Sequence, residues 1–125
     1  MRKNWVFIGL MAIAVAFTGC KKEEGELEIE LNTPLENTEY TSPVALDAHI
    51  HGGDLIIHDI EIKVFETANV ANVVFDYDNH VEVTDFDVVD VITANVTAPT
   101  TFTIQINVGE DDHTASLSRN FIIKP

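Results

Sequence analysis

The stretch TFTIQINV at Thr101–Val108 alternates polar and apolar side chains without a break. Because successive side chains of a β-strand point to opposite faces of its sheet, this period of two predicts a strand with one buried face. A loop follows at residues 109–113, and a second strand is predicted after it, which would close a hairpin. The alternate positions of this strand that are expected to face the core hold Ala115, Leu117, Phe121 and Ile123. Arg119 falls on the same inward parity, so we expect it near a strand end or a bulge.

The same period recurs upstream and predicts an all-β fold. The inward positions are Leu27, Ile29 and Leu31 in one strand, Val44, Leu46, Ala48 and Ile50 in the next, and Ile60, Ile62 and Val64 in a third. Further strands are indicated at Val73–Phe75, Val81–Val83 and Val88–Ile92, with ambiguous registers over residues 66–98. About seven short antiparallel strands, with turns roughly every 8–12 residues, predict an immunoglobulin-like β-sandwich with Greek-key connections.

Length and charge limit the functions that this chain can have. A chain of 125 residues is enough for one domain. Its 21 acidic and 7 basic residues give a formal charge of -14, which excludes a nucleic-acid binder that works by neutralising phosphates. A single cysteine excludes an internal disulfide and a cysteine-based zinc site.

The first residues are typical of a secretory signal peptide. Arg2 and Lys3 precede an uncharged run from Trp5 to Phe17, and the small residues Thr18 and Gly19 come next. A membrane-spanning helix needs about 20 apolar residues, so this run is too short to be a stable anchor by itself. Positive, apolar and small residues in this order precede a cleavage site.

The only cysteine lies directly after these residues, at position 20. Phe17-Thr18-Gly19-Cys20 resembles the lipobox of bacterial lipoproteins, although the family usually has leucine where this chain has Phe17. The resemblance implies that Cys20 is lipidated and becomes the first residue of the mature chain. The alternative is ordinary cleavage after Ala14-Val15-Ala16, which would leave Cys20 as a free thiol.

Three segments are therefore predicted. Residues 1–19 are a lipoprotein signal peptide, residues 20–26 a lipidated charged tether of at most about 23 Å, and residues 27–125 the sandwich domain. Lys21-Lys22-Glu23-Glu24 resembles the signal that sends lipoproteins of Bacteroidetes to the outer cell surface. We expect an outer-membrane lipoprotein displayed on the surface, with a periplasm-facing location as the alternative.

The tether and the turns together support a family resemblance. Its features are the lipobox, the charged tether, the Asn32–Asn37 opening, the Gly52-Gly53-Asp54 turn and the closing Thr101–Pro125 hairpin. With these features, residues 20–125 resemble the short immunoglobulin-like lipoproteins of Bacteroidetes that are grouped as a domain of unknown function. This family implies a lipid-anchored sandwich and brings no activity, cofactor or site residue with it.

A candidate metal site lies on the second predicted strand. Asp47, His49 and His51 alternate along it, so their side chains share the outward face. Two imidazoles and a carboxylate suit zinc, copper or nickel. His58 either approaches His51 across the glycine turn or, by sharing the parity of Ile60, caps the core at the end of the sheet. The other interpretation is a solvated polar face without a metal.

Five acids in the middle of the chain suggest a second cation. These are Asp76, Asp78, Asp85, Asp87 and Asp90. An EF-hand is excluded, because counting from Asp76 its sixth position is Val81, where the loop requires glycine. A looser calcium site shared by the five acids is one interpretation, and acids that only keep the domain soluble are the other.

No motif for an enzyme is present in the sequence. It contains neither Gly-x-Ser-x-Gly nor His-Glu-x-x-His, and it has no phosphate-binding glycine loop. We expect a non-catalytic module that binds a protein, glycan or other envelope partner through its edge strands and end loops. The alternative is a metal-binding lipoprotein that uses the histidines, and no cofactor is expected other than such a divalent metal.

Overall fold

The structure is a computed structural model that describes residues 27–110 and 113–125. The predicted signal peptide and the whole predicted tether, including Cys20, therefore lie outside the described residues. The described residues form eight strands and no helix, which confirms the predicted all-β class. The strands are β1 (Glu28–Thr33), β2 (Glu39–Thr41), β3 (Val44–His51), β4 (Ile57–Glu66), β5 (Asn69–Val83), β6 (Asp85–Ile92), β7 (Thr100–Gly109) and β8 (Thr114–Lys124).

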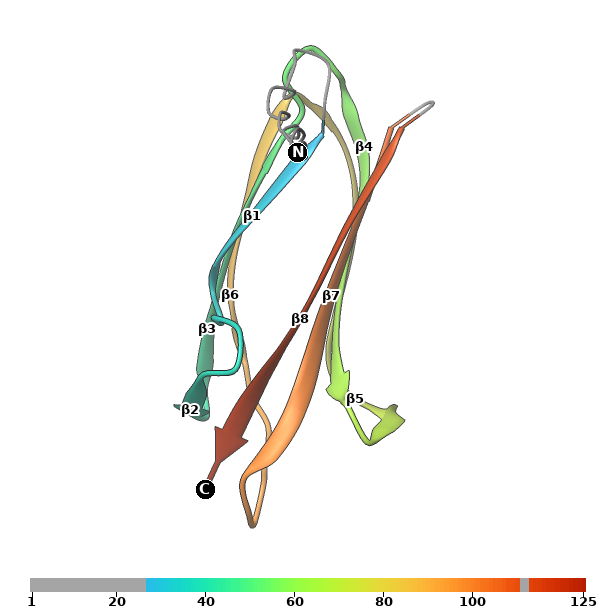
Figure 1. The fold of residues 1–125 in the computed structure, drawn as a ribbon. Coiled ribbons are helices and arrows are strands. Elements are labelled where there is room, and N and C mark those ends of the chain that lie inside the picture. Colours follow the sequence, from blue (N-terminus) through green and yellow to red (C-terminus); the bar gives the residue numbers. More distant parts are fainter. Residues whose placement is uncertain (1–26, 111–112) are drawn as a thin grey trace, which may run out of the picture.

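The strands form two sheets that pack face to face (Figure 1). One sheet has the order β1-β3-β6 and the other the order β2-β8-β7-β4-β5. In the immunoglobulin fold the first, second, fourth and fifth strands share a sheet that faces the third, sixth and seventh. In this protein β1, β3 and β6 correspond to the first, second and fifth strands, and they face β4, β7 and β8. β5 lies beside β4 in the second sheet in place of the fourth strand, and β2 is an added edge. The predicted immunoglobulin-like sandwich is confirmed.

Three details of the predicted strand set are wrong. The described residues contain eight strands instead of seven, and β2 pairs with β8 in parallel, so the sandwich is not wholly antiparallel. β2 has only three residues, which is too few for an alternation to be visible in the sequence. The strands predicted at Val73–Phe75 and Val81–Val83 are parts of one strand, β5, whose 15 residues pair with β4 across several register shifts.

The core is made by the inward side chains of both sheets. All the inward positions predicted on β3 and β7 are buried, as are Ile60, Ile62 and Val64 on β4. The Phe102 and Phe121 rings lie 6.2 Å apart, and Tyr40 meets Phe121 edge to face at 6.1 Å. Burying a large apolar side chain contributes about 1.5–3 kcal/mol, so this layer is the main source of stability.

Arg119 joins the two sheets instead of marking a strand end or a bulge. It lies in the regular part of β8, opposite Ile104. One of its guanidinium nitrogens, Nη1, donates to the carbonyl oxygens of Leu31 at 2.8 Å and Pro34 at 3.0 Å. The expectation was wrong because the inward charge is accommodated by backbone acceptors at the end of β1, which the sequence alone does not reveal.

Gly52 lies where the turn after β3 meets the crossing between β5 and β6. Its N–H donates to the carbonyl of Thr84 at 2.7 Å, and Thr84 is the single residue between β5 and β6. A Cβ atom at Gly52 would lie 2.5 Å from the Leu55 carbonyl oxygen and 3.1 Å from that of Thr84. Only glycine fits there, and Gly53 next to it has a φ of 65°, which also favours glycine.

All five histidines of the chain lie at one end of the sandwich. His49 and His51 are at the end of β3, His58 is at the start of β4, His80 is near the end of β5, and His113 directly precedes β8. Glu28, where β1 begins, pairs with His51 at the same end (Figure 1). The described part of the chain therefore begins at the histidine end. None of the described residues forms a helix long and apolar enough to cross a membrane.

The Gly52 contact predicts a large effect of a small substitution. We expect Gly52→Ala to lower the free energy of unfolding by about 1–3 kcal/mol, because the added methyl group must displace backbone atoms. Urea denaturation measures this difference. The matched control is Gly109→Ala, where a Cβ atom meets nothing within 4 Å. A change of less than about 0.5 kcal/mol is expected for the control, and equal effects of the two variants would contradict the assignment.

Candidate metal centre

Histidines and acids form two rows across the outer face of the three-stranded sheet. The register of β1, β3 and β6 places each histidine of β3 between two acids: Glu30, His49 and Asp87 in one row, and Glu28, His51 and Asp85 in the next. Directly opposite side chains in an antiparallel pair lie about 5 Å apart, which brings each imidazole within reach of a carboxylate. The outward alternation predicted for β3 is the cause of this arrangement.

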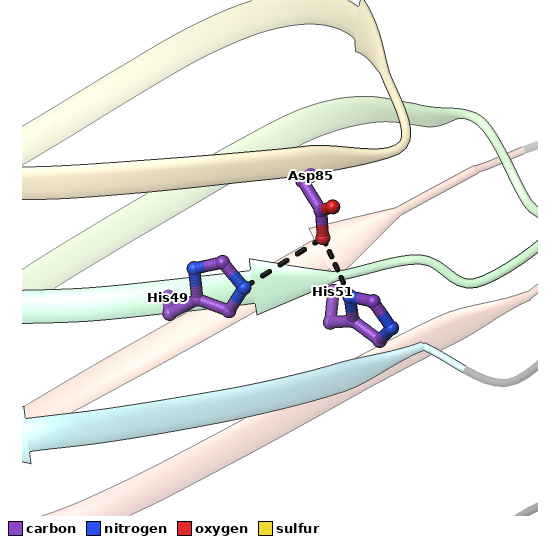
Figure 2. A group of neighbouring side chains, drawn as sticks. All are labelled: His49, His51 and Asp85. Atoms are coloured by element: carbon purple, nitrogen blue, oxygen red, sulfur yellow. Dashed lines mark hydrogen bonds and ion pairs between the residues drawn. The ribbon is translucent and has the colours of Figure 1, made fainter.

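The three side chains His49, His51 and Asp85 converge (Figure 2). One oxygen of Asp85, Oδ1, lies 2.5 Å from Nδ1 of His51 and 3.6 Å from Nε2 of His49. The two imidazole rings are stacked, with centroids 6.1 Å apart and planes 23° apart. One ligand atom from each of the three residues lies within 4.8 Å of the other two.

This geometry is close to that of a transition-metal site. Ligand atoms held about 2.1 Å from a tetrahedral ion lie about 3.4 Å from one another, so small side-chain adjustments would admit an ion. His49 also hydrogen-bonds Asp87 through Nδ1, which leaves its Nε2 facing Asp85. A metal-binding histidine is usually oriented by a carboxylate on its second nitrogen in this way.

Asp47 does not take part in this group. It lies on β3, two residues before His49, and its neighbour on β6 is Val89. The carboxylate that joins the two histidines is that of Asp85. Asp85 is 34 residues from His51 in the sequence and meets it only through the pairing of β3 with β6. The sequence identified Asp85 as an acid of interest, but nothing in it indicated which strand would lie beside β3.

His58 belongs to a different group of side chains. A register shift between β4 and β5 at Ile57–Asp59 turns Ile57 into the core beside Ile60, so the parity inferred for His58 is wrong. His58 instead stacks on His80, with ring centroids 6.0 Å apart, on the five-stranded sheet. It is grouped there with His80 and Glu82, and not with His51.

The five acids considered for calcium are divided between the two sheets. Asp76 and Asp78 lie on β5 in the five-stranded sheet, whereas Asp85, Asp87 and Asp90 lie on β6 in the other sheet. The carboxylates of Asp85 and Asp87 contact histidines, and that of Asp90 accepts the N–H of Val91. The shared calcium site is therefore wrong, because the chain changes sheets at Thr84.

The carboxylates around His49 favour its protonated form. The hydrogen bond to Asp87 is the largest cause that raises the pKa of His49 above its ordinary value of 6.5. Partial burial opposes this shift, and the charges of Asp87, Asp85 and Glu30 add to it. A metal ion at this site therefore competes with a proton that His49 binds more tightly than an ordinary imidazole does.

This shift predicts how stability and titration depend on pH. A raised histidine pKa stabilises the fold below pH 6.5, and the contribution is lost as pH rises through the raised pKa. We expect Asp87→Asn to move the pKa of His49 down towards 6.5 and to reduce this loss. NMR titration of the His49 ring in the presence of a chelator measures its pKa. Chemical denaturation below pH 6.5 and at mildly alkaline pH measures how much stability is lost between the two.

Asp90→Asn is the matched control for this titration. Asp90 lies on the same strand, and its carboxylate accepts a hydrogen bond from Val91 and is not among the causes of the His49 shift. The control should leave the His49 titration unchanged. If Asp87→Asn also leaves it unchanged, the hydrogen bond is not the source of the shift.

Comparison with known proteins informs the fold alone. No family model and no curated protein matches the chain. The chain is similar to the crystal structure of an engineered protein, a Northeast Structural Genomics Consortium target, with a TM-score of 0.54 and 10% sequence identity. This similarity covers 80% of the chain but only 20% of that structure. It agrees with the β-sandwich, and the resemblance to Bacteroidetes lipoproteins stays a prediction.

Proposed function

We propose that this protein is a non-catalytic lipoprotein of the cell envelope that binds a divalent transition-metal ion at His49, His51 and Asp85. The observation that carries the proposal is the position of Asp85 Oδ1, 3.6 Å from Nε2 of His49 and 2.5 Å from Nδ1 of His51. Imidazole and carboxylate ligands together suit zinc, copper or nickel. The two paired strands β3 and β6 hold these ligands on one face.

The exposure of the ligands favours an ion that exchanges with solvent. The side chains of His49, His51 and Asp85 are 35%, 51% and 54% exposed. Three protein ligands leave the fourth tetrahedral position open to water or to a ligand from another molecule. An accessible site with an open position is suited to capturing, buffering or presenting a metal at the envelope.

Zinc titration tests this site directly. We expect the His49→Ala, His51→Ala double variant to lose more than about 100-fold in zinc affinity, because loss of even an outer partner of a metal ligand typically costs about 10–100-fold. The affinity is read from the amide signal of Asp85 during the titration. The buffer contains millimolar calcium, which occupies sites that offer only oxygen ligands and so keeps zinc from binding there.

His113→Ala is the matched control for the zinc titration. His113 is also at this end of the sandwich, but its ring contacts Glu110 and is in neither ligand group. The control should bind zinc as the unaltered protein does. Equal zinc affinity in the double variant and the unaltered protein would exclude this site.

A glycan partner is a second candidate, and a hollow at the opposite end of the sandwich favours it. The hollow has a volume of about 430 Å³, and amide and hydroxyl groups line it together with Glu66 and apolar side chains. These polar residues include Asn72, Asn95, Thr97 and Thr100. Such groups hydrogen-bond sugar hydroxyls. A glycan array tests this candidate, and equal signals for the protein and an Asn72→Ala variant would contradict it.

The lipid anchor is supported by the sequence before the domain. Cys20 ends a lipobox-like stretch and precedes the charged residues Lys21 and Lys22. Two acyl chains give stable attachment to a membrane, whereas one gives only marginal binding. Residues 27–125 contain 18 acids and 3 cations, a formal charge of -15, which disfavours contact of the domain with an anionic membrane surface.

Cys20→Ala tests the anchor. In a bacterial host that lipidates its own lipoproteins, we expect the unaltered chain in the membrane fraction with a radioactive palmitate label, and the variant without the label. Because Cys20 is the only cysteine, any thioether-linked label on the chain is attached there. The control is Lys21→Ala, which keeps the lipobox. A palmitate label on both Cys20→Ala and the unaltered chain would contradict lipidation at this residue.

A further inference from the structure

A second histidine and acid group lies on the outer face of the five-stranded sheet. It consists of His58 on β4 with His80 and Glu82 on β5. One ligand atom from each residue lies within 4.8 Å of the other two. The group shares no residue with His49, His51 and Asp85, and its strands belong to the other sheet.

The contacts of His80 orient one of its nitrogens towards the centre of this group. Its Nδ1 lies 3.0 Å from Oδ1 of Asp59, directly opposite it on β4. Its Nε2 lies 3.8 Å from Oε2 of Glu82. The ring of His58 stacks on that of His80 with planes 26° apart, which places a second imidazole beside the first.

The two groups have the same design. Each has two ligands at alternate positions of one strand, a third on the neighbouring strand, and a histidine whose Nδ1 contacts a carboxylate outside the ligand set. The outer carboxylate is Asp87 in the first group and Asp59 in the second. Such an outer carboxylate fixes the ring and makes the ligating nitrogen more basic.

The charge of the second group also suits a divalent cation. With both imidazoles neutral, Glu82 and Asp59 supply two negative charges, which balance the two positive charges of the ion. His80, Glu82 and Asp59 are 63%, 71% and 70% exposed, so an ion can reach them from solvent. Ordinary surface ion pairs contribute little to stability, so ion pairing alone gives little reason for these side chains to converge.

We propose that His58, His80 and Glu82 form a second binding site for a divalent transition-metal ion, with Asp59 as the residue that positions His80. The site does not rest on the first one, because the two share no ligand. The protein then carries two metal sites on opposite outer faces, both at the end of the sandwich where the described chain begins.

Zinc calorimetry on the purified protein in millimolar calcium tests the second site. We expect two zinc ions per chain, and one in a His58→Ala, His80→Ala variant. The His49→Ala, His51→Ala variant should also retain one. Asp59→Asn keeps the ligands but should weaken the second site by about 10–100-fold. These side chains are largely exposed or half-buried, so we expect the variants to fold.

Asp78→Asn is the matched control for Asp59→Asn. Asp78 lies on the same outward parity of β5 as His80, opposite Glu61, and is in neither ligand group. It should change zinc affinity less than twofold. Retention of two zinc ions by the His58, His80 variant would overturn the second site alone. One ion in the unaltered protein that is lost with His49 and His51 would overturn it while supporting the first site.

Discussion

The hydrogen bond from the N–H of Gly52 to the carbonyl of Thr84 fixes the point at which the chain changes sheets. Val83 ends β5 in one sheet and Asp85 begins β6 in the other, so Thr84 alone makes the crossing. The contact holds the end of β3 against this crossing, and the pairing of His51 with Asp85 is adjacent to it. A side chain at position 52 would displace chiefly the Leu55 carbonyl in the turn after β3 and would also press on the Thr84 carbonyl.

Much of the fold follows from the alternation of apolar and polar side chains along the strands. Val44, Leu46, Ala48 and Ile50 are buried because every second side chain of β3 faces the other sheet, and the same rule applies to β7. Burial of so many aliphatic side chains on alternate positions leaves few arrangements besides two packed sheets. The outward face of His49 and His51 was predicted for the same reason, since their neighbours had to point inward.

The wrong predictions concern residues where this alternation is interrupted or where the outcome depends on which strands pair. The register shift beside His58 moves it from the core parity to the outer face, and no local residue signals the shift. Asp85 joins the site because β6 lies next to β3, a choice made by the whole topology. Arg119 keeps its inward position because Leu31 and Pro34 offer carbonyl groups to it. Such long-range contacts are not encoded in any short stretch of sequence.

The acidity of the domain concentrates cations of every kind near its surface, so charge alone cannot select a metal. Selection requires the softer imidazole nitrogens, because calcium and magnesium prefer oxygen ligands. The same acids raise the pKa of His49 and of His80, chiefly through the contacts with Asp87 and Asp59, so protons compete for both proposed sites. A metal bound at neutral pH would therefore be released on acidification. The acids that attract the ion and orient its ligands thus also limit the pH range over which it stays bound.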